Sequence, residues 1–452
     1  MDFNILVGLI GIGALVGLIA IRVPIAYSMI LVGGVGVTVL NGPLIFMSQL
    51  KDLAWAQFSV YDLSVVPLFV LMGAFASRAG LSRDLFRAAN AWLGWLRGGV
   101  AMSAIAACAG FGAVCGSSLA TASTMGAVAL PELRRYKYSG ALATGTLAAG
   151  GVLGILIPPS VVLIIYAITV EANVVTMFMA ALIPGILAVF LFLVTIALYV
   201  AVFPNSGPAG EFPQRREFIE ATLRILPVGL IFGAVIGGIY FGLFNPTPAA
   251  AAGAFLVFCY GLVRGELKLP DMREALLETA RTTGMIYLIL LGAEMLKIFM
   301  SRGGIPQTMA EWMVNSGLAP MVILLVLLAA LILLGCIMDS LSMILLAIPF
   351  FWPVIVEING GDYVTAADAA FGLDAEDLKI WFGILALVVV ELGLITPPVG
   401  MNVFIISAQA PDVPMRDTFI GVAPFFMAEM VRVALLIAFP AITLWLPRIL
   451  SG

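Results

Sequence analysis

The stretch LGILIPPSVVLII (Leu153–Ile165) places two adjacent prolines, Pro158 and Pro159, inside an apolar segment that is long enough to cross a lipid bilayer. Proline lacks a backbone N–H, and its ring clashes with the carbonyl four residues earlier, so an uninterrupted helix disfavours both residues. In the first turn of a helix, however, the missing N–H would have no partner anyway. The stretch therefore indicates either a tolerated kink or one helix that ends here while another begins.

The composition predicts an all-α integral membrane protein. The chain has 452 residues, of which 62% are hydrophobic and 11% are charged, and a soluble chain of this length could not bury so much apolar surface. Because one crossing takes about 20 apolar residues, we expect about ten spanning helices. They are expected at residues 3–21, 24–40, 60–78, 139–168, 175–203, 221–243, 247–264, 282–301, 380–410 and 418–447.

Two apolar segments, 99–131 and 319–356, are too short for two crossings and carry small or polar residues at their centres. We expect two re-entrant hairpins there, because non-helical backbone is tolerated at membrane depth only inside protein or beside a wet cavity. Three further stretches, 44–58, 81–97 and 270–281, are amphipathic and are expected to lie along the membrane interface.

The basic residues indicate the orientation in the membrane. With ten crossings and an outside N-terminus, the main clusters of Lys and Arg all fall on the cytoplasmic side, as the positive-inside rule requires. The first hairpin then opens to the cytoplasm and the second to the outside. The residues on which this assignment depends are Arg83, Arg87, Arg97, Arg134, Arg135, Lys137, Arg215, Arg216, Arg224, Arg264, Lys268, Arg273, Arg281 and Arg416.

The proline stretch has a second copy. GILIPPS (Gly154–Ser160) returns as GLITPPV (Gly393–Val399), 239 residues later, and SSL (Ser117–Leu119) corresponds to DSL (Asp339–Leu341), 222 residues later. Each half of the chain thus contains a hairpin followed by a helix that is broken at Pro-Pro. Since the two hairpins open to opposite sides, the sequence predicts inverted repeats with two broken helices, an arrangement typical of secondary transporters.

Helix ends suggest what the breaks do. A half-helix that begins after each Pro-Pro presents free N–H groups near Ser160 and Gly400. Because serine is a good N-cap residue, Ser118 and Ser340 are expected to start the second arms of the hairpins. Four helix N-termini would then meet near the bilayer midplane. Because each carries a partial positive charge, together they favour an anion.

The other side of each break suits a cation. The carbonyls left unpaired in Gly154–Ile157 and Gly393–Thr396 can ligate a hard cation such as sodium. Asp339 is the one acid at an expected hairpin tip, and its carboxylate either binds the cation, caps the helix that starts at Ser340, or does both. Ser117 takes its place in the first hairpin, so we expect two sodium sites of unequal charge.

Other acids in apolar segments are weaker candidates. Glu294 and Lys297 are three residues apart on one helix, as are Glu429 and Arg432, and each couple is expected to form an ion pair. Glu391 precedes the second break by a few residues and ranks below Asp339 as a site residue.

The segments Gly116–Ser160 and Gly393–Ile405 closely resemble the large membrane subunit of the tripartite ATP-independent periplasmic (TRAP) transporters, that is, a DctM-like protein. The resemblance covers essentially the whole chain. It implies sodium-coupled secondary active import of an organic acid anion, such as a C4-dicarboxylate or sialic acid, with two or more Na⁺ as coupling ions. It also implies an elevator-type transporter in a bacterial inner membrane.

The resemblance implies partners as well. A small membrane subunit of about four helices (Q-type) braces the large subunit in the lipid bilayer, and a periplasmic binding protein (P-type) delivers the acid. In some members the two membrane subunits are fused. This chain starts directly at the large subunit, so a separate small subunit is expected, while no nucleic-acid partner is expected.

Carried onto this chain, the elevator has five segments. The moving parts are 99–170 (first hairpin and broken helix) and 319–411 (second hairpin and broken helix), and the scaffold is 1–98 with its interfacial arm helices, 171–318 and 412–452. The expected substrate-binding residues are Ser117, Ser118, Pro159, Ser160, Pro398, Val399, Gly400 and Asn402. The expected sodium ligands are Gly116, Ser117, Gly154, Ile157, Met338, Asp339, Ser340, Gly393 and Thr396. Val399 stands where the first half has Ser160, so the two breaks are not expected to grip a substrate in the same way.

Three alternatives remain at this stage. A self-sufficient sodium–anion symporter of related fold would need no binding protein, and a channel would also use broken helices. An intramembrane enzyme has no support, since the chain contains no histidine, no HExxH motif and no recognisable pairing of a nucleophile with a base.

Overall fold

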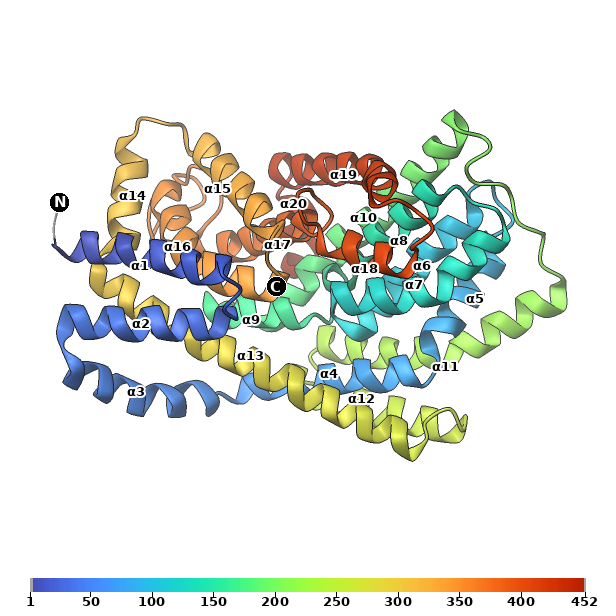
Figure 1. Cartoon of the computed structure of the whole chain (residues 1–452), viewed down its shortest axis with the longest axis horizontal. Coiled ribbons are helices and arrows are strands. Elements are labelled where there is room, and N and C mark those ends of the chain that lie inside the picture. The colour runs from blue at the N-terminus through green and yellow to red at the C-terminus, as the bar shows by residue number, and fades with distance from the viewer. Residues whose placement is uncertain (1–2, 451–452) are drawn as a thin grey trace.

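The computed structural model describes residues 3–450, which form twenty α-helices and one short 3₁₀ helix, η1 (Tyr61–Ser64) (Figure 1). The helices of the first part are α1 (Phe3–Ala20), α2 (Ile25–Asn41), α3 (Pro43–Phe58), α4 (Val65–Arg78), α5 (Leu81–Leu93), α6 (Gly99–Cys115), α7 (Ser118–Arg135), α8 (Gly140–Leu156), α9 (Val161–Thr169) and α10 (Val174–Val202). Those of the second part are α11 (Arg215–Tyr240), α12 (Pro246–Val263), α13 (Leu269–Gly303), α14 (Ile305–Asn315), α15 (Pro320–Gly335), α16 (Ser340–Asn359), α17 (Ala375–Gly393), α18 (Met401–Gln409), α19 (Met415–Ala438) and α20 (Ala441–Leu450).

The prediction of an all-α multi-pass membrane protein is confirmed. Within residues 3–450, eight helical segments are long and apolar enough to cross a membrane, and the bent pair α8 and α9 makes a ninth. One of the eight, α16, has 20 residues and is the second arm of the expected second hairpin, not an expected crossing. The ten expected crossings are the other seven segments, the pair α8 and α9, α2, which has 17 residues, and the pair α17 and α18. The first turn of α17 carries Glu376 and Asp377, which makes that end polar.

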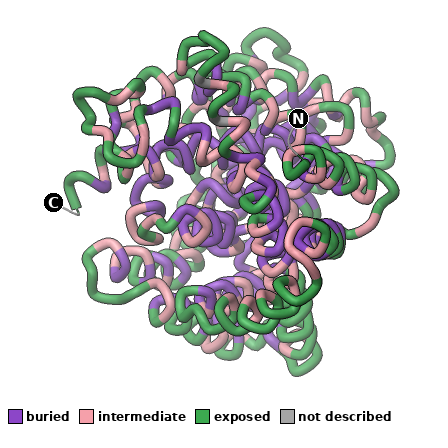
Figure 2. The backbone as a smooth tube through the Cα atoms, turned by 90° about the vertical axis from the view of Figure 1, so that its left-hand side faces the viewer, coloured by how far each residue is buried: buried purple, intermediate pink, exposed green. Residues whose placement is uncertain are grey.

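The outer surface of the molecule is apolar. Figure 2 shows the buried residues gathered in the centre and the exposed ones around the periphery. Only Gly8 and Leu15 are buried in α1, and every residue of α3 is at least partly exposed. A surface of this kind is stable only in lipid, where apolar side chains face an apolar solvent.

One group of helices packs along the long α13. This helix lies against α2 and α4 (Figure 1), and α12 also packs on α4. The expected interfacial stretch 270–281 is not a separate element. It is the beginning of α13, a continuous helix of 35 residues that starts with Pro270 in its first turn.

Two other expectations need correction at their boundaries. The expected single span 418–447 is two helices, α19 and α20, because Pro440 interrupts the helical hydrogen bonds between them. The expected hairpin 319–356 consists of α15 and α16, and a separate short helix, α14, precedes it.

The hairpins and broken helices are present where the sequence placed them. The first hairpin is α6 with α7 and the second is α15 with α16, while α8 and α9 are bent by 47° at the first Pro-Pro. Equivalent elements make equivalent contacts, since α6 packs on α8 as α15 packs on α17, and α9 packs on α16 as α18 packs on α7. The second half-helix of each break therefore packs on the hairpin of the other half of the chain. These matching contacts support the internal repeat, while the opposite orientation of the two repeats in the membrane stays a prediction.

Glycines let the hairpins reach the broken helices. A Cβ added to Gly112 would lie 2.7 Å from the Gly154 Cα, and one added to Gly393 would lie 2.6 Å from the Gly335 Cα. The backbones of α6 and α8, and of α15 and α17, therefore cross with no room for a side chain between them. This close approach brings each hairpin tip next to a break.

Two long helices, α10 and α19, pack on this central group. α19 lies against α8, α10 and α17, and Trp381 Nε1 in α17 donates a hydrogen bond to the Leu436 carbonyl of α19 at 2.9 Å. A Cβ added to Gly421 in α19 would lie only 1.8 Å from the Ala141 carbonyl oxygen of α8. The backbones of α8 and α19 are thus in direct contact.

We expect Gly421→Ala to lower the apparent melting temperature of the purified protein, because the new methyl group would overlap the Ala141 carbonyl and overpacking costs about 1–3 kcal/mol. Gly229→Ala in α11 is the matched control, since nothing lies within 4 Å of the position that its Cβ would take. Fluorescence-detected size exclusion after heating measures both variants. Equal melting temperatures would mean that α8 and α19 do not pack this closely.

Candidate functional site

The first hairpin tip is a capped helix start. Gly116 ends α6 in the left-handed region, with a φ of 61°, and Ser117 follows in extended conformation. The Ser117 Oγ accepts a hydrogen bond from the Ala120 N–H at 3.4 Å, so Ser117 is the N-cap of α7. The expectation that the second arm starts at Ser118 is confirmed, and the serine that caps it is Ser117, because the turn at Gly116 leaves Ser117 as the last non-helical residue.

The second hairpin tip is capped by an acid. Asp339 Oδ2 accepts from the Ser342 N–H at 3.1 Å and Oδ1 accepts from the Ser342 hydroxyl at 2.5 Å. Asp339 is therefore the N-cap of α16, and α16 starts at Ser340, so the expected capping role of Asp339 is confirmed. Two hydrogen bonds leave acceptor sites of the carboxylate free, so capping α16 and ligating a cation are compatible.

The first break lies directly against the first tip. Ser160 is the N-cap of α9, with its Oγ accepting from the Leu163 N–H at 3.5 Å, and Ile157 ends α8 in extended conformation. A Cβ added to Gly116 would lie 3.2 Å from the Pro159 carbonyl oxygen, and one added to Gly154 would lie 2.6 Å from the Ser117 carbonyl oxygen. The structure thus brings the expected residues of tip and break together.

The second break differs from the first in exposure. Pro158 and Pro159 are buried, whereas Pro397 and Pro398 are exposed. Gly400, with a φ of 62°, is the N-cap of α18 and supplies no side chain, and Val399 beside it is partly exposed. The unequal polarity expected from the two sequences is therefore accompanied by unequal access to the two breaks.

The remaining expected residues of the second half lie close to its break. Met338 is buried in the turn before Asp339, with 5% of its surface exposed. Gly393 ends α17 against Gly335. The Thr396 hydroxyl donates to the Leu392 carbonyl at 2.6 Å, which closes the last turn before the prolines.

Asn402 connects the second half-helix α18 to the other half of the chain. Its Nδ2 donates to the Ala148 carbonyl of α8 at 3.3 Å, and its Oδ1 is buried without a hydrogen-bond partner among residues 3–450. Thr121 Oγ1 is also buried without a hydrogen-bond partner among residues 3–450. It lies 2.6 Å from the position that a Cβ added to Gly154 would take. A buried polar atom without a partner is expected where an ion, water or ligand binds.

These donors fit a sodium ion better than a transition metal. Within the part of the chain that the structure describes, no three His, Cys, Asp or Glu residues come together. The oxygens at the tips and breaks are carbonyls, hydroxyls and the carboxylates of Asp339 and Glu391. Hard cations prefer such oxygen ligands. Thr121 was missed in the sequence, where its only signal is its place in the first turn after the tip.

Glu391 is the residue whose importance the sequence understated. It is fully buried, its Oε1 accepts from the Ser340 hydroxyl at 2.5 Å, and its Oε2 accepts from the Ser118 hydroxyl. The two expected ion pairs are confirmed, since Glu429 pairs with Arg432 and Glu294 pairs with Lys297 at 3.5 Å.

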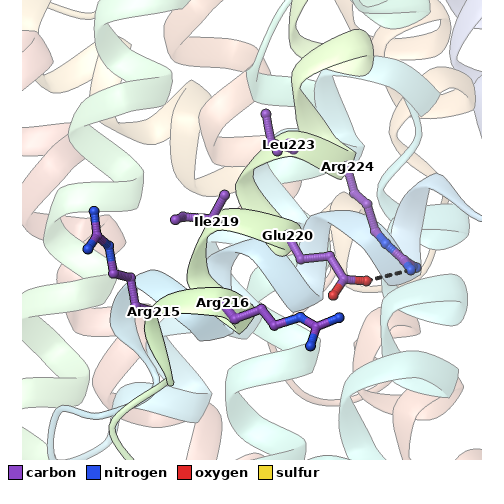
Figure 3. Close-up of a pocket in the computed structure, with 6 residues that line it drawn as sticks. All are labelled: Arg215, Arg216, Ile219, Glu220, Leu223 and Arg224. Atoms are coloured by element: carbon purple, nitrogen blue, oxygen red, sulfur yellow. Dashed lines mark hydrogen bonds and ion pairs between the residues drawn. The ribbon is translucent and has the colours of Figure 1, made fainter.

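A surface groove lies away from the tips and breaks. It is formed at the start of α11 by Arg215, Arg216, Ile219, Glu220, Leu223 and Arg224, and α11 packs mainly on α5 and α12. Figure 3 shows Arg215 and Arg216 pointing away from each other, while Arg224 pairs with Glu220 at 2.8 Å. The groove belongs to the basic surface that is expected to face the cytoplasm and not to the breaks.

Comparison with known proteins shows one consistent similarity. The family profile described as "Tripartite ATP-independent periplasmic transporter, DctM component" matches residues 12–442. The C4-dicarboxylate TRAP transporter large permease protein DctM of Pseudomonas aeruginosa is 34% identical over 389 residues, 86% of each chain. The sialic acid TRAP transporter large permease protein SiaM of Vibrio cholerae is 30% identical over 440 residues, which cover 96% of this chain and 97% of that protein.

A solved structure has the same fold. The YdaH transporter of Alcanivorax borkumensis superimposes with a TM-score of 0.61 over 89% of each chain, at 13% sequence identity. At this low identity the similarity concerns the fold alone.

The caps themselves can be tested by stability. Asp339→Ala is expected to lower the free energy of unfolding by about 1 kcal/mol, the usual effect of losing an N-cap, whereas Asp339→Asn retains an acceptor for the Ser342 N–H and stays near the parent. Thermal unfolding of both purified variants gives the comparison. If Asp339→Ala unfolds like the parent, the carboxylate does not cap α16.

Proposed function

Because the chain belongs to the DctM family of large permease components of TRAP transporters, we propose that it imports an organic acid anion by coupling it to sodium. The observation that carries the proposal is the group of four helix starts, those of α7, α9, α16 and α18, at the two tips and two breaks. Helix N-termini favour anions, and the oxygens beside them favour a hard cation.

We propose two sodium sites of unequal charge, one at each hairpin tip. The first uses oxygens of Gly116, Ser117, Gly154 and Ile157, and Thr121 adds a hydroxyl with no other partner among residues 3–450. The second uses Met338, Ser340, Gly393 and Thr396 with the carboxylate of Asp339. The negative charge of Asp339 makes the second site the stronger one for a cation.

The substrate lies between the breaks in this proposal. The named relatives carry C4-dicarboxylates and sialic acid, and both are carboxylates. The N–H groups that follow Pro159 and Pro398 can bind a carboxylate, and the hydroxyls of Ser117, Ser118 and Ser160 add polar contacts. On the second side Val399 is apolar, while Gly400 lets the substrate approach the backbone and Asn402 supplies an amide.

The proposed movement is an elevator. The hairpins and broken helices, in 99–170 and 319–411, would move against the helices that pack along α13. Since α10 and α19 pack on α8 and α17, they would travel with the moving part, although their segments, 171–318 and 412–452, were expected to be scaffold. The Arg432 guanidinium donates to the Pro184 carbonyl at 3.3 Å, which ties α19 to α10 inside this group.

The proposal includes two partners and a location. A small four-helix membrane subunit would cover part of the apolar outer surface, and a periplasmic binding protein would deliver the acid. Both belong to the tripartite architecture that the family description names. The location that follows is a bacterial inner membrane, with the basic loops in the cytoplasm.

Uptake by proteoliposomes tests the proposal. With the small subunit and the cognate binding protein present, we expect accumulation of a C4-dicarboxylate or sialic acid that requires both an inward sodium gradient and the binding protein. Each component is left out in turn as the control. Uptake that ignores the sodium gradient contradicts sodium coupling, and uptake by this chain alone favours a self-sufficient symporter.

Asp339→Asn separates cation binding from capping. The amide keeps an acceptor for α16 but removes the charge, so we expect the sodium concentration for half-maximal uptake to rise about tenfold or more, with little change in stability. Glu294→Gln, another acid in a membrane helix, is the control and should leave the sodium dependence unchanged. An unchanged sodium dependence in Asp339→Asn would falsify its role as a ligand.

A further inference from the structure

Glu391 in α17 has no surface exposed, and its neighbours differ from those of the other buried glutamate. Glu429 forms an ion pair with Arg432. Glu391 has no ion pair among residues 3–450 and instead accepts hydrogen bonds from two serine hydroxyls, one on each carboxylate oxygen. The bond from Ser340 is 2.5 Å long, and hydrogen bonds to a carboxylate are among the strongest in proteins.

The two serines occupy equivalent positions in the two halves. Ser118 is the first residue of α7 and Ser340 is the first residue of α16, so each begins the second arm of a hairpin. They are 222 residues apart in the sequence, because 340 minus 118 is 222. A single carboxylate on a third helix therefore joins the two hairpin tips.

We infer that Glu391 is a positioning residue, a strut that holds the two tips at a fixed separation and makes the two proposed sodium sites respond together. Ser117 and Asp339 immediately precede the two serines, so an ion that shifts one tip also shifts its serine. The carboxylate passes this shift to the other serine. The strut itself rests on the hydrogen bonds, and only its effect on sodium rests on the proposed function.

The strut depends on reach more than on charge, and two variants separate these properties. Glu391→Gln keeps the length of the side chain, and its amide can accept from one serine and donate to the other. Glu391→Asp keeps the charge but is one methylene shorter, so it cannot contact both serines. We expect Glu391→Gln to keep the melting temperature and sodium cooperativity of the parent, and Glu391→Asp to resemble Glu391→Ala in both.

A double-mutant cycle, measured by thermal unfolding, tests the strut without any transport assay. Ser118→Ala and Ser340→Ala, singly and together, are compared in the parent and in the Glu391→Ala background by the apparent melting temperature. We expect shifts that do not add in the parent, because both serines act on one carboxylate, and shifts that do add in Glu391→Ala. Additive shifts in the parent overturn the inference.

Ser103→Ala is the matched control for the serine substitutions. Ser103 is equally buried in α6, but its hydroxyl donates to the Gly99 and Ala89 carbonyls at 2.7 and 3.1 Å and has no contact with Glu391. Its effect on the melting temperature should be the same in both backgrounds. A difference comparable to that of the tip serines would show that Glu391 acts on the fold in general, which also overturns the strut.

Sodium-driven uptake tests the consequence for coupling. We expect the Hill coefficient for sodium to fall toward one in Glu391→Asp, and half-maximal uptake to need about tenfold more sodium. Glu391→Gln should stay within about threefold of the parent. If sodium-dependent uptake stays cooperative in Glu391→Asp and loses its cooperativity in Glu391→Gln, the charge of Glu391 matters and the length of its side chain does not, which overturns the inference. If uptake by the parent protein does not depend on sodium, the proposed function fails. The double-mutant cycle of melting temperatures still tests whether Glu391 joins the two tips.

Discussion

The structure depends on one constraint, that backbone N–H and C=O groups inside hydrocarbon must find partners within the protein. Four helices begin inside the protein here, and three of those starts are closed by their own side chains, those of Ser117, Ser160 and Asp339. The interruption is tolerated because each hairpin lies against a broken helix at glycines such as Gly154 and Gly393, where the backbones come into direct contact inside the protein.

The same caps explain why one place can attract opposite charges. A helix start offers N–H groups to an anion, and the end of the preceding helix offers carbonyls to a cation. At each Pro-Pro these two ends are only a few residues apart. In the proposed function, a carboxylate and a sodium ion would therefore bind to neighbouring backbone groups, and each charge would lower the cost of bringing in the other.

Much of this architecture could be predicted from the sequence because it depends on short, local sequence patterns. Pro-Pro marks each break, apolar runs mark the helices, and the two copies of the pattern mark the two halves. Both second arms start at the expected serines, but the cap of α7 at Ser117 was not foreseen, since the exact end of a turn depends on the conformation of Gly116. Contacts between distant segments could not be read, and Glu391 is the clearest example, because its partners are 273 and 51 residues away.

The unequal burial of the two breaks has a consequence for how the molecule works over time. Pro158 and Pro159 are covered while Pro397 and Pro398 are open, although their surroundings are built in the same way. The two halves thus differ in the burial of corresponding residues. In the proposed transport cycle, an exchange of these two arrangements between the halves would turn the binding region to face the other compartment.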